Sequence, residues 1–490
     1  MKKVVIVGGG IAGLSAGIYA RRAGFETEIY EKNAVAGGQC MGWNRKGCHI
    51  DNCLHWLTGT KKGTGLRKIW EETGALDPDT EFVKSDKFYT ACVGKERVTL
   101  WRDLDRTKRE LTALSPEDRE ETERFIAHVK YAMCCEMPVE KPMDEMGIMD
   151  YIKLMKAMGD MPKVAKAYGK INLSDMAAKF KNPALRAMIT DYMPGEYTAT
   201  PYLVSYATIA SGNGDVPKGG SLAMAGRMVK RYEELGGRLY CGCPVKKIRL
   251  NGKTAEGILL EDGREIKGDY IICATDTMEM FENLIGKQWM DKKWKACFDN
   301  EQAYPTFSGL QAAFVIDREF YEETDTVFFD CRPFTVGERT IERMSVKSYE
   351  YEPEFAPEGK TVLQSNVLQT DEEYRYWKAL DREEYEKRKA EFAEELKERI
   401  IEKFPKLSGH IELLDAWTPV TYERYCNAYH GAYMSFITKK DSKSYNMKGV
   451  VKGLKHLYLA GQWLQFPGGL PVAAATGKFA VQRILKEKNR

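Results

Sequence analysis

Three glycines near the N-terminus have the spacing of a dinucleotide-binding loop. Gly8, Gly10 and Gly13 form the pattern G-x-G-x-x-G between the apolar run 4–7 and a helix-like run that follows. The first glycine permits a tight turn, the second lets backbone N–H groups approach a pyrophosphate, and the third lets helix and strand pack closely. The helix N-terminus adds partial positive charge to the same site. The pattern therefore predicts a pyrophosphate site, whereas the alternative is a glycine-rich turn without a ligand.

An acidic residue stands where the ribose of such a ligand would lie. Glu31 ends the strand-like run 27–30, 18 residues after Gly13, and Lys32 follows it. A carboxylate at this place accepts hydrogen bonds from ribose hydroxyls and repels the 2′-phosphate of NADP. We therefore expect the adenosine half of the ligand at the end of this strand.

Two further segments separate FAD from NAD. Gly37-Gly38 follows Glu31 at a distance seen in FAD proteins whose chain loops back under the pyrophosphate. The segment 457–461, then 467–471 and a helix, looks like the part of the same proteins that meets the flavin ring. Together these motifs resemble the FAD-dependent family of phytoene desaturases, carotenoid isomerases and retinol saturases, within the wider amine-oxidase-like group.

The resemblance extends along most of the chain. Residues 51–59 resemble the D-x-G-x-H-Y-x-G pattern of the retinol saturase branch, although Cys53 replaces its usual glycine. Residues 418–432 resemble the substrate-side loop, and Gln462 stands where many relatives carry an acid. The fingerprint and the resemblance together predict FAD contacts at Gly8, Gly10, Ile11, Ala12, Gly13, Glu31, Lys32, Gly38, Gln39, Val245, Ala274, Gly461, Gln462, Gly469, Leu470 and Pro471.

Histidines are the candidate catalytic residues. His55 and His430 are two of only six histidines, and His55 follows the loop that should run toward the flavin. The alternative for each is a hydrogen-bonded polar side chain without a catalytic role. The sequence has no G-x-S-x-G elbow and no hydrolytic triad.

Cysteines near these residues do not indicate a metal. Cys40, Cys48, His49, Cys53 and His55 lie within sixteen residues, but their spacing is not the C-x₂-C type of structural zinc sites. We expect buried free thiols near the cofactor and no metal. The pairs Cys134-Cys135 and Cys241-x-Cys243 are interpreted as packing residues.

The elements that must position these residues alternate between strands and helices. A strand at 4–7, a helix at 11–23 and a strand at 27–30 imply a parallel sheet with a right-handed crossover. Residues 305–370 alternate apolar and polar, which favours antiparallel strands. We predict an α/β fold with a Rossmann-type FAD-binding domain and an interleaved α+β substrate domain, made of an antiparallel sheet and a helical cap. The FAD domain takes 1–100, 215–285 and 445–490, and the substrate and cap domain takes 101–214 and 286–444.

Composition sets the broad class of the protein. The chain has 490 residues, 43% of them hydrophobic, with 74 Lys and Arg against 71 Asp and Glu. This balance gives no general electrostatic reason to bind nucleic acid. Its 12 scattered cysteines suggest reduced thiols and a cytoplasmic location, with peripheral membrane contact as a further hypothesis.

The reaction expected from the resemblance is hydride transfer at a carbon–carbon bond, or isomerisation, of an apolar polyene or lipid-like substrate. An amine or amino-acid oxidase on the same scaffold is one alternative, and a non-catalytic flavin-binding protein is another. No second G-x-G-x-x-G follows a strand, so we expect no dedicated NAD(P)H site. The electron acceptor is left open between the substrate, oxygen, a quinone and a protein partner.

Methionine is concentrated in residues 130–195, where eleven of the 21 methionines fall. Methionine adapts to irregular apolar ligands, so this segment is predicted to form a mobile cap that admits the substrate. Lysines interleave with apolar residues between 152 and 170, as in a helix that rests on anionic lipid. The alternative is a helical cap with a solvated lysine face and a methionine-rich core.

Overall fold

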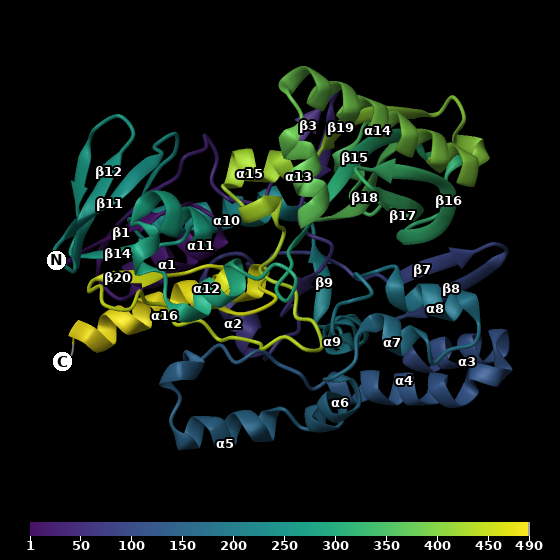
Figure 1. Ribbon diagram of the computed structural model, residues 1–490, viewed down its shortest axis with the longest axis horizontal. Coiled ribbons are helices and arrows are strands. Elements are labelled where there is room, and N and C mark those ends of the chain that lie inside the picture. The colour runs from purple at the N-terminus through teal and green to yellow at the C-terminus, as the bar shows by residue number, and fades with distance from the viewer. Residues whose placement is uncertain (489–490) are drawn as a thin grey trace.

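The computed structural model describes residues 1–488, and one half of the molecule is organised around a parallel sheet (Figure 1). Its strands run in the order β10–β2–β1–β14–β20 and all neighbours are parallel. Their bounds are Arg238–Tyr240, Glu26–Tyr30, Lys3–Val7, Tyr270–Cys273 and Leu457–Leu459. Because these strands come from distant parts of the sequence, the sheet gathers the two ends of the chain at one side of the molecule.

Alternate residues of β1 explain why the sheet is covered on both faces. Val4 and Ile6 pack against helices α1 (Ile11–Arg22), α10 (Gly220–Glu234) and α16 (Leu470–Lys488). Val5 and Val7 point the other way, into a core shared with β11 (Val245–Asn251), β12 (Thr254–Leu260) and the helix α12 (Lys292–Phe298). β12 also pairs with β13 (Glu265–Lys267). Side chains of a strand alternate between faces, so an all-apolar strand such as β1 requires two covered faces.

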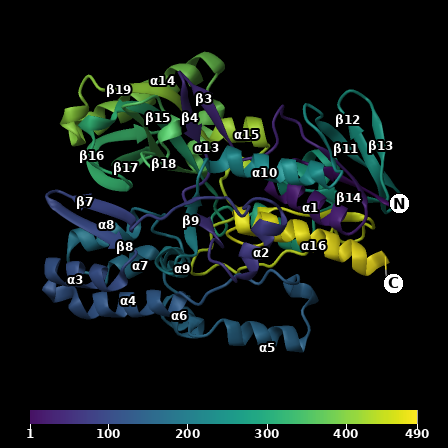
Figure 2. The same cartoon turned by 180° about the vertical axis from the view of Figure 1, so that it is seen from behind.

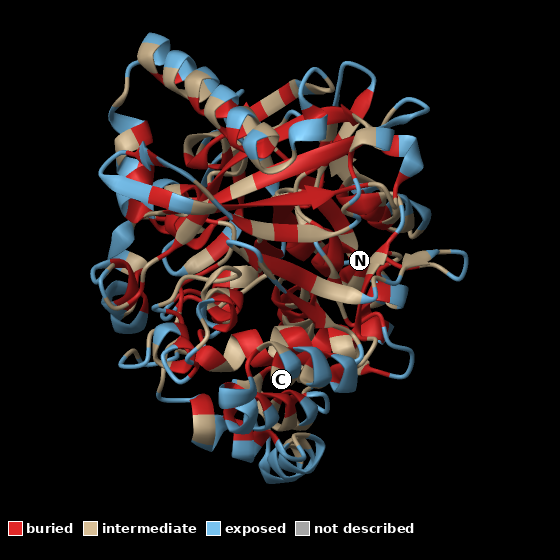
Figure 3. Cartoon of the chain, turned by 90° about the vertical axis from the view of Figure 1, so that its right-hand side faces the viewer, coloured by how far each residue is buried: buried red, intermediate tan, exposed pale blue. Residues whose placement is uncertain are grey.

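A second, mostly antiparallel sheet forms the other half of the molecule. Its strand order is β19–β15–β18–β17–β16–β7–β8, with β7 parallel to β16. The bounds are Ile411–Trp417, Phe307–Asp317, Lys360–Thr370, Arg339–Ser348, Thr326–Val336, Lys87–Val93 and Glu96–Trp101. The long helix α14 (Arg382–Lys403) covers one face, where its apolar side chains share a core with the strands. Buried residues concentrate in the strands and exposed ones on the outer helices (Figure 3).

Helices α3 to α9 pack below this sheet (Figures 1 and 2). Their bounds are Leu104–Leu114, Arg119–Ala132, Ile148–Ala157, Met161–Tyr168, Leu173–Ala177, Pro183–Thr190 and Ala199–Ala210. Most of them share a core with β7 and β8. Helix α5 is different, because none of its residues is buried and it lies at the edge of the molecule in both views.

The remaining elements connect the two sheets. They are the hairpin β3 (Gly42–Arg45) with β4 (Cys48–Asp51), a small sheet of β5 (Leu57–Thr58), β9 (Gly214–Pro217) and β6 (Phe82–Val83), and the helices α2 (Gly65–Glu72), α11 (Thr277–Glu279), α13 (Asp371–Ala379) and α15 (Pro419–Cys426). Within residues 1–488, no helix combines the length and the apolar character needed to cross a membrane.

This architecture confirms the predicted fold class. One boundary differs: β7 and β8 lie inside the segment 1–100 that was assigned to the FAD domain, yet they pair in the antiparallel sheet. Antiparallel alternation was recognised only in residues 305–370, so residues 87–101 were assigned to the FAD domain with the rest of the N-terminal segment. We therefore propose that the first FAD segment ends before Lys87.

Candidate functional site

A cavity of about 520 Å³ opens at the carboxyl ends of the parallel strands. Gly8 follows β1, Glu31 follows β2 and Ala274 follows β14, and all three line it. The first turns of α1 and α16 also line the cavity. This is the place where doubly wound α/β sheets bind ligands, because the loops there diverge and helix N-termini point into the gap.

Most of the predicted FAD contacts meet in this cavity. It is lined by Gly8, Gly10, Ile11, Ala12, Glu31, Lys32, Gly38, Gln39, Val245, Ala274, Gly461, Gln462, Gly469, Leu470 and Pro471. Gly13 does not line it. A Cβ on Gly13 would lie 1.9 Å from the carbonyl oxygen of Gly8, so this glycine lets α1 pack on the loop, the role expected of the third glycine.

Glu31 does more than face the cavity. Its Oε2 accepts a hydrogen bond from the N–H of Gly9 at 2.7 Å, and its Oε1 accepts from the backbone and side-chain nitrogens of Asn33 at 2.9 and 2.8 Å. The carboxylate therefore stabilises the glycine loop, and its remaining lone pairs can accept hydrogen bonds from a ribose.

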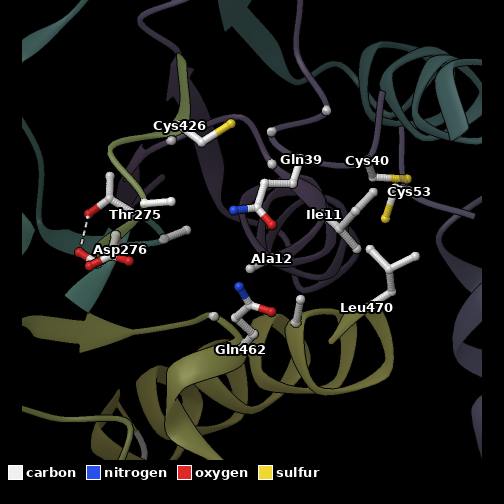
Figure 4. Close-up of a pocket in the computed structure, with 18 of the residues that line it drawn as sticks. Ile11, Ala12, Gln39, Cys40, Cys53, Thr275, Asp276, Cys426, Gln462 and Leu470 are labelled. Carbon is white, nitrogen blue, oxygen red and sulfur yellow. Dashed lines mark hydrogen bonds between the residues drawn. The ribbon is translucent and has the colours of Figure 1, made fainter. Parts of the chain in front are cut away.

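Two glutamines approach the cavity from opposite sides (Figure 4). The amide nitrogen of Gln39 donates to the carbonyl oxygen of Ala432 at 2.8 Å, and Oε1 of Gln462 accepts from the N–H of Gly469 at 3.1 Å. Gln462 thus fixes the loop that leads into α16. Because Gln462 is neutral, the start of α16 keeps its partial positive charge uncompensated by an adjacent acid.

These features fit FAD. Gly8, with φ +98°, has a backbone shape that favours glycine, and a Cβ there would lie 3.0 Å from the carbonyl oxygen of Ala274. The loop thereby brings bare backbone to the N-terminus of α1, where a pyrophosphate is stabilised. A second helix N-terminus, that of α16, borders the same cavity. One elongated ligand with a central diphosphate can use both.

The other end of the cavity is built by the antiparallel sheet and the 418–432 loop. Gln311 donates to the hydroxyls of Tyr422 and Tyr433, each at 2.8 Å. Tyr422 in turn donates to Asn52 at 2.7 Å, and Tyr433 to Asn366 at 2.9 Å. Burial raises the pKa of both phenols, so they stay neutral. The two rings pack edge to face, with centroids 5.2 Å apart.

His55 reaches the same region, as predicted. His55 lines the cavity and is exposed to that space. Burial first, and the neighbouring Lys347 second, lower the pKa of the imidazole to about 3. His55 is therefore a neutral imidazole at physiological pH, which can donate through one nitrogen and accept through the other.

Lys347 is a buried cation that the sequence did not reveal. Its Nζ donates to the carbonyl oxygen of Leu54 at 3.1 Å and lies over the rings of Tyr349 and Tyr351, 4.6 and 5.7 Å from their centroids. Within residues 1–488 it forms no ion pair. Burial lowers its pKa to about 8. A lysine in an antiparallel strand gives no local sign that it will point inward.

His430 lies outside the lining of this cavity, so the structure favours its alternative interpretation as a hydrogen-bonded polar side chain. Its Nδ1 lies 2.7 Å from Oδ1 of Asp371, and its ring stacks between Tyr374 and Tyr429. It does not line the cavity. The hydrogen-bonding capacity of this ring nitrogen is used by Asp371. The sequence analysis had named such a hydrogen-bonded histidine as the alternative to a catalytic one.

The methionines between 133 and 193 do not line the cavity either. Met161, Met176 and Met188 are buried in the core of the helical region, and Met149 and Met155 are exposed on α5. The prediction of a methionine-lined substrate wall is therefore wrong. The segment supplies its own core, as the alternative interpretation held.

Other lining residues were missed because they carry no motif. Asp276 follows β14 and accepts hydrogen bonds from Met278 and Tyr429, and burial raises its pKa to about 6. Cys426 also lines the cavity, in the segment that resembles a substrate-side loop. Among residues 1–488, no cluster of three or more His, Cys, Asp or Glu is arranged to hold a metal.

Comparison with known proteins gives concordant matches. A family model described as flavin containing amine oxidoreductase matches residues 11–485. Phytoene desaturase (lycopene-forming) of Paracoccus sp. is 23% identical over 519 residues, which cover 99% of this chain and 98% of the relative. All-trans-retinol 13,14-reductase of Danio rerio is 22% identical over 550 residues, covering 98% and 86%. An oxidoreductase structure from Methanosarcina mazei matches with a TM-score of 0.61 at 16% identity, covering 99% and 100%.

Proposed function

This chain belongs to the flavin-containing amine oxidoreductase family and is an FAD-dependent oxidoreductase, and we propose that it acts on a carbon–carbon bond of an apolar polyene or lipid-like substrate. The reaction is a desaturation, a saturation or an isomerisation. Two relatives that match nearly the whole chain are named for reactions of this kind, one a phytoene desaturase and the other a retinol reductase.

The observation that carries the substrate class is the character of the cavity beyond the flavin contacts. There the walls come from Trp56, Leu57, Tyr422 and Tyr433, with neutral His55 among them. The carboxylates among the described lining residues are Glu31, Asp276 and Glu279, all of which follow strands of the parallel sheet. An apolar substrate needs no counter-ion, so this end of the cavity suits it.

An amine oxidase fits less well. The charge of buried Lys347, which helps to lower the pKa of His55, would repel a cationic amine. The rings of Tyr422 and Tyr433 contact each other edge to face and leave no slot between them for an ammonium group. The third alternative, a non-catalytic flavin carrier, predicts a bound flavin that no substrate reduces or reoxidises.

The residues of the chain have distinct tasks in this reaction. Gly8, Gly10 and the start of α1 would hold the pyrophosphate, and Glu31 the ribose. The bound flavin supplies an acceptor and donor of hydride. The first turn of α16 would place partial positive charge where the reduced ring becomes negative. Trp56 and the neutral phenols of Tyr422 and Tyr433 would exclude water and hold the substrate chain in place.

An anaerobic absorbance titration tests this function. Purified holoprotein is mixed with polyenes, retinoids and amines, and dithionite-reduced holoprotein is mixed with the unsaturated members. We expect the flavin to be bleached or reoxidised by a polyene or retinoid. Bleaching by amines alone would establish the oxidase instead, and no response to any compound would favour the flavin carrier.

The electron acceptor is proposed to be oxygen, a quinone or a protein partner rather than NAD(P)H. Only one G-x-G-x-x-G follows a strand, and that loop belongs to the cavity described above. Mixing the oxidised holoprotein anaerobically with NADH or NADPH should leave the flavin spectrum unchanged. Rapid stoichiometric bleaching by either nucleotide would contradict the proposal.

We further propose that α5 rests on an anionic lipid surface. Ile148 is 81% exposed and Met149 65%, and Ile152 and Met155 are exposed as well. Nearby Lys153, Lys156, Lys166 and Lys170 form no ion pair within residues 1–488. An apolar helix flanked by lysines binds the boundary of an anionic bilayer, and each lysine near the surface contributes about 1 kcal/mol.

Liposome flotation tests the membrane proposal. The wild type should float with vesicles that contain phosphatidylserine and float less with neutral vesicles. Ile148→Asp with Met149→Asp should remain at the bottom, as should Lys153→Glu with Lys156→Glu on anionic vesicles. Val35→Asp, at an exposed apolar residue elsewhere, is the control and should float like the wild type. Equal sedimentation of all proteins would end the proposal.

A further inference from the structure

Two cysteines stand together on one wall of the cofactor cavity (Figure 4). Cys40 is buried and Cys53 is half-buried, and both are free thiols. Neither belongs to the function proposed above. Their positions are set by the hairpin of β3 and β4, which enters and leaves the cavity wall at these two residues.

The two cysteines flank the paired residues of the hairpin. Gly42 pairs with Asp51, and the N–H of Asn52 donates to the carbonyl oxygen of Met41 at 3.0 Å, which extends the ladder by one residue. Cys40 and Cys53 are the next residues outward on either side of the hairpin.

The chain turns at Cys40 after leaving the ladder. The N–H of Cys40 donates to the carbonyl oxygen of Gly37 at 3.1 Å, and that of Met41 donates to the carbonyl oxygen of Gln39 at 3.0 Å. The side chains of Cys40 and Cys53 lie next to one another on the cavity wall in Figure 4. A disulfide between them requires a Cα separation of about 4.4 to 6.8 Å.

A single carboxylate holds both cysteines in place. Oδ1 of Asp51 accepts from the N–H of Cys53 at 3.0 Å and from the hydroxyl of Ser221 at 2.7 Å. The thiol of Cys40 donates to the carbonyl oxygen of Ser221 at 3.6 Å. The hydrogen bond between the two thiols is the largest cause that raises the pKa of Cys40, followed by burial. Both cysteines line the same cavity, and the raised pKa keeps the thiol of Cys40 protonated.

We infer that Cys40 and Cys53 are a redox pair that closes to a disulfide and stores one electron pair beside the flavin. On closure, two S–H bonds break and one S–S bond forms. The two electrons and two protons released pass to the oxidised flavin in the same cavity, and the reverse step reopens the disulfide. The inference rests on flavin binding and is independent of which substrate the protein takes.

Thiol mapping by mass spectrometry is the first test, and it does not depend on catalysis. Holoprotein and flavin-free protein are treated with oxidised glutathione or with dithiothreitol, denatured in iodoacetamide and digested. We expect a Cys40–Cys53 cross-linked peptide after oxidation and two alkylated cysteines after reduction. Cys53→Ser should leave Cys40 alkylated under both conditions. Cys135→Ser, at a half-buried cysteine outside the cavity, should behave like the wild type.

Anaerobic reductive titration of the flavin is the second test. After oxidation, the wild type should take up twice as many electrons per flavin as Cys53→Ser or Cys40→Ser. Alkylation of both cysteines in the oxidised wild type would overturn the inference. A cross-link without the extra electron uptake would also overturn it, because the disulfide would then be merely structural. If the protein held no flavin, the cofactor assignment would fail, and the mapping of flavin-free protein would still decide whether the pair closes.

Discussion

Glu31 and Gly9 join the ends of two neighbouring parallel strands: Oε2 of Glu31 accepts a hydrogen bond from the N–H of Gly9 at 2.7 Å. A Cβ on Gly9 would lie 3.0 Å from the Cβ of Glu31, so the two residues touch. The carboxylate therefore shapes the loop that must hold the pyrophosphate, in addition to facing the ribose position.

Glu31→Gln is expected to weaken FAD binding through both roles. A hydrogen bond to a charged group contributes roughly 1.5–3 kcal/mol, so the dissociation constant should rise at least about tenfold. Fluorescence titration of flavin-free protein with FAD measures this. Glu26→Gln, at the half-buried start of the same strand, is the matched control and should bind like the wild type. Unchanged affinity in Glu31→Gln would remove this residue from the site.

Gly13→Ala is expected to prevent the close packing of α1 on the glycine loop. The added Cβ would lie 1.9 Å from the carbonyl oxygen of Gly8, a backbone atom that cannot move without distorting the loop. Purified Gly13→Ala should therefore lose bound flavin and melt at a lower temperature.

Gly226→Ala is the matched control for this change. Gly226 lies inside α10, and a Cβ there meets nothing within 4 Å. Alanine is favoured over glycine inside a helix by about 1 kcal/mol, so this variant should keep its flavin and melt no lower than the wild type. Equal behaviour of the two variants would refute the packing role of Gly13.

Local patterns made the cofactor half of the site predictable. The glycine spacing, the acidic residue after the second strand and the glycine-proline loop before the last helix each act through backbone that lies close in sequence. Gly8, Glu31 and Gly469 therefore line the cavity as expected. The parallel pairing of β1 with β2 was also expected from the strand–helix–strand order.

The substrate half could not be predicted in the same way. Gln311 and Lys347 come from strands of the antiparallel sheet, and which face of that sheet turns toward the cavity is settled only by tertiary packing. His430 shows the opposite case, since its residue type suggested chemistry whereas its partner Asp371 favours a structural role. The proximity of Cys40 to Cys53 depends on a hairpin that no motif marks.

Lys347→Met is expected to change how stability depends on pH. The native protein holds the pKa of this amine at about 8 against the ordinary 10.5, so the folded state binds the proton more weakly than the unfolded state. The cost of burying the charge, at most about 3 kcal/mol, is present below pH 8 and disappears as the pH rises to 10.5. The stability of the wild type should therefore increase across this range.

Urea unfolding at several pH values measures this effect. In Lys347→Met the free energy of unfolding should not rise above pH 8. Below pH 8 the variant avoids the cost of burying a charge, and loss of the hydrogen bond to Leu54 offsets part of that stabilisation. Lys246→Met, at an exposed position, should keep the wild-type pH dependence. Parallel curves for wild type and Lys347→Met would show that the amine is solvated rather than buried.

His55→Gln is expected to reduce acid sensitivity. Burial and Lys347 lower the pKa of His55 to about 3 in the folded protein, whereas the unfolded chain binds a proton near the ordinary value of 6.5. Between these values the unfolded state holds more protons, so the stability of the wild type falls as the pH drops from 6.5 toward 3. Glutamine cannot titrate, so urea unfolding of His55→Gln should show a shallower loss of stability over this pH interval.

His128→Gln, at a histidine outside the cavity, serves as the control and should follow the wild type. An equally steep loss in His55→Gln would mean that the folded protein does not lower the pKa of His55 below its ordinary value.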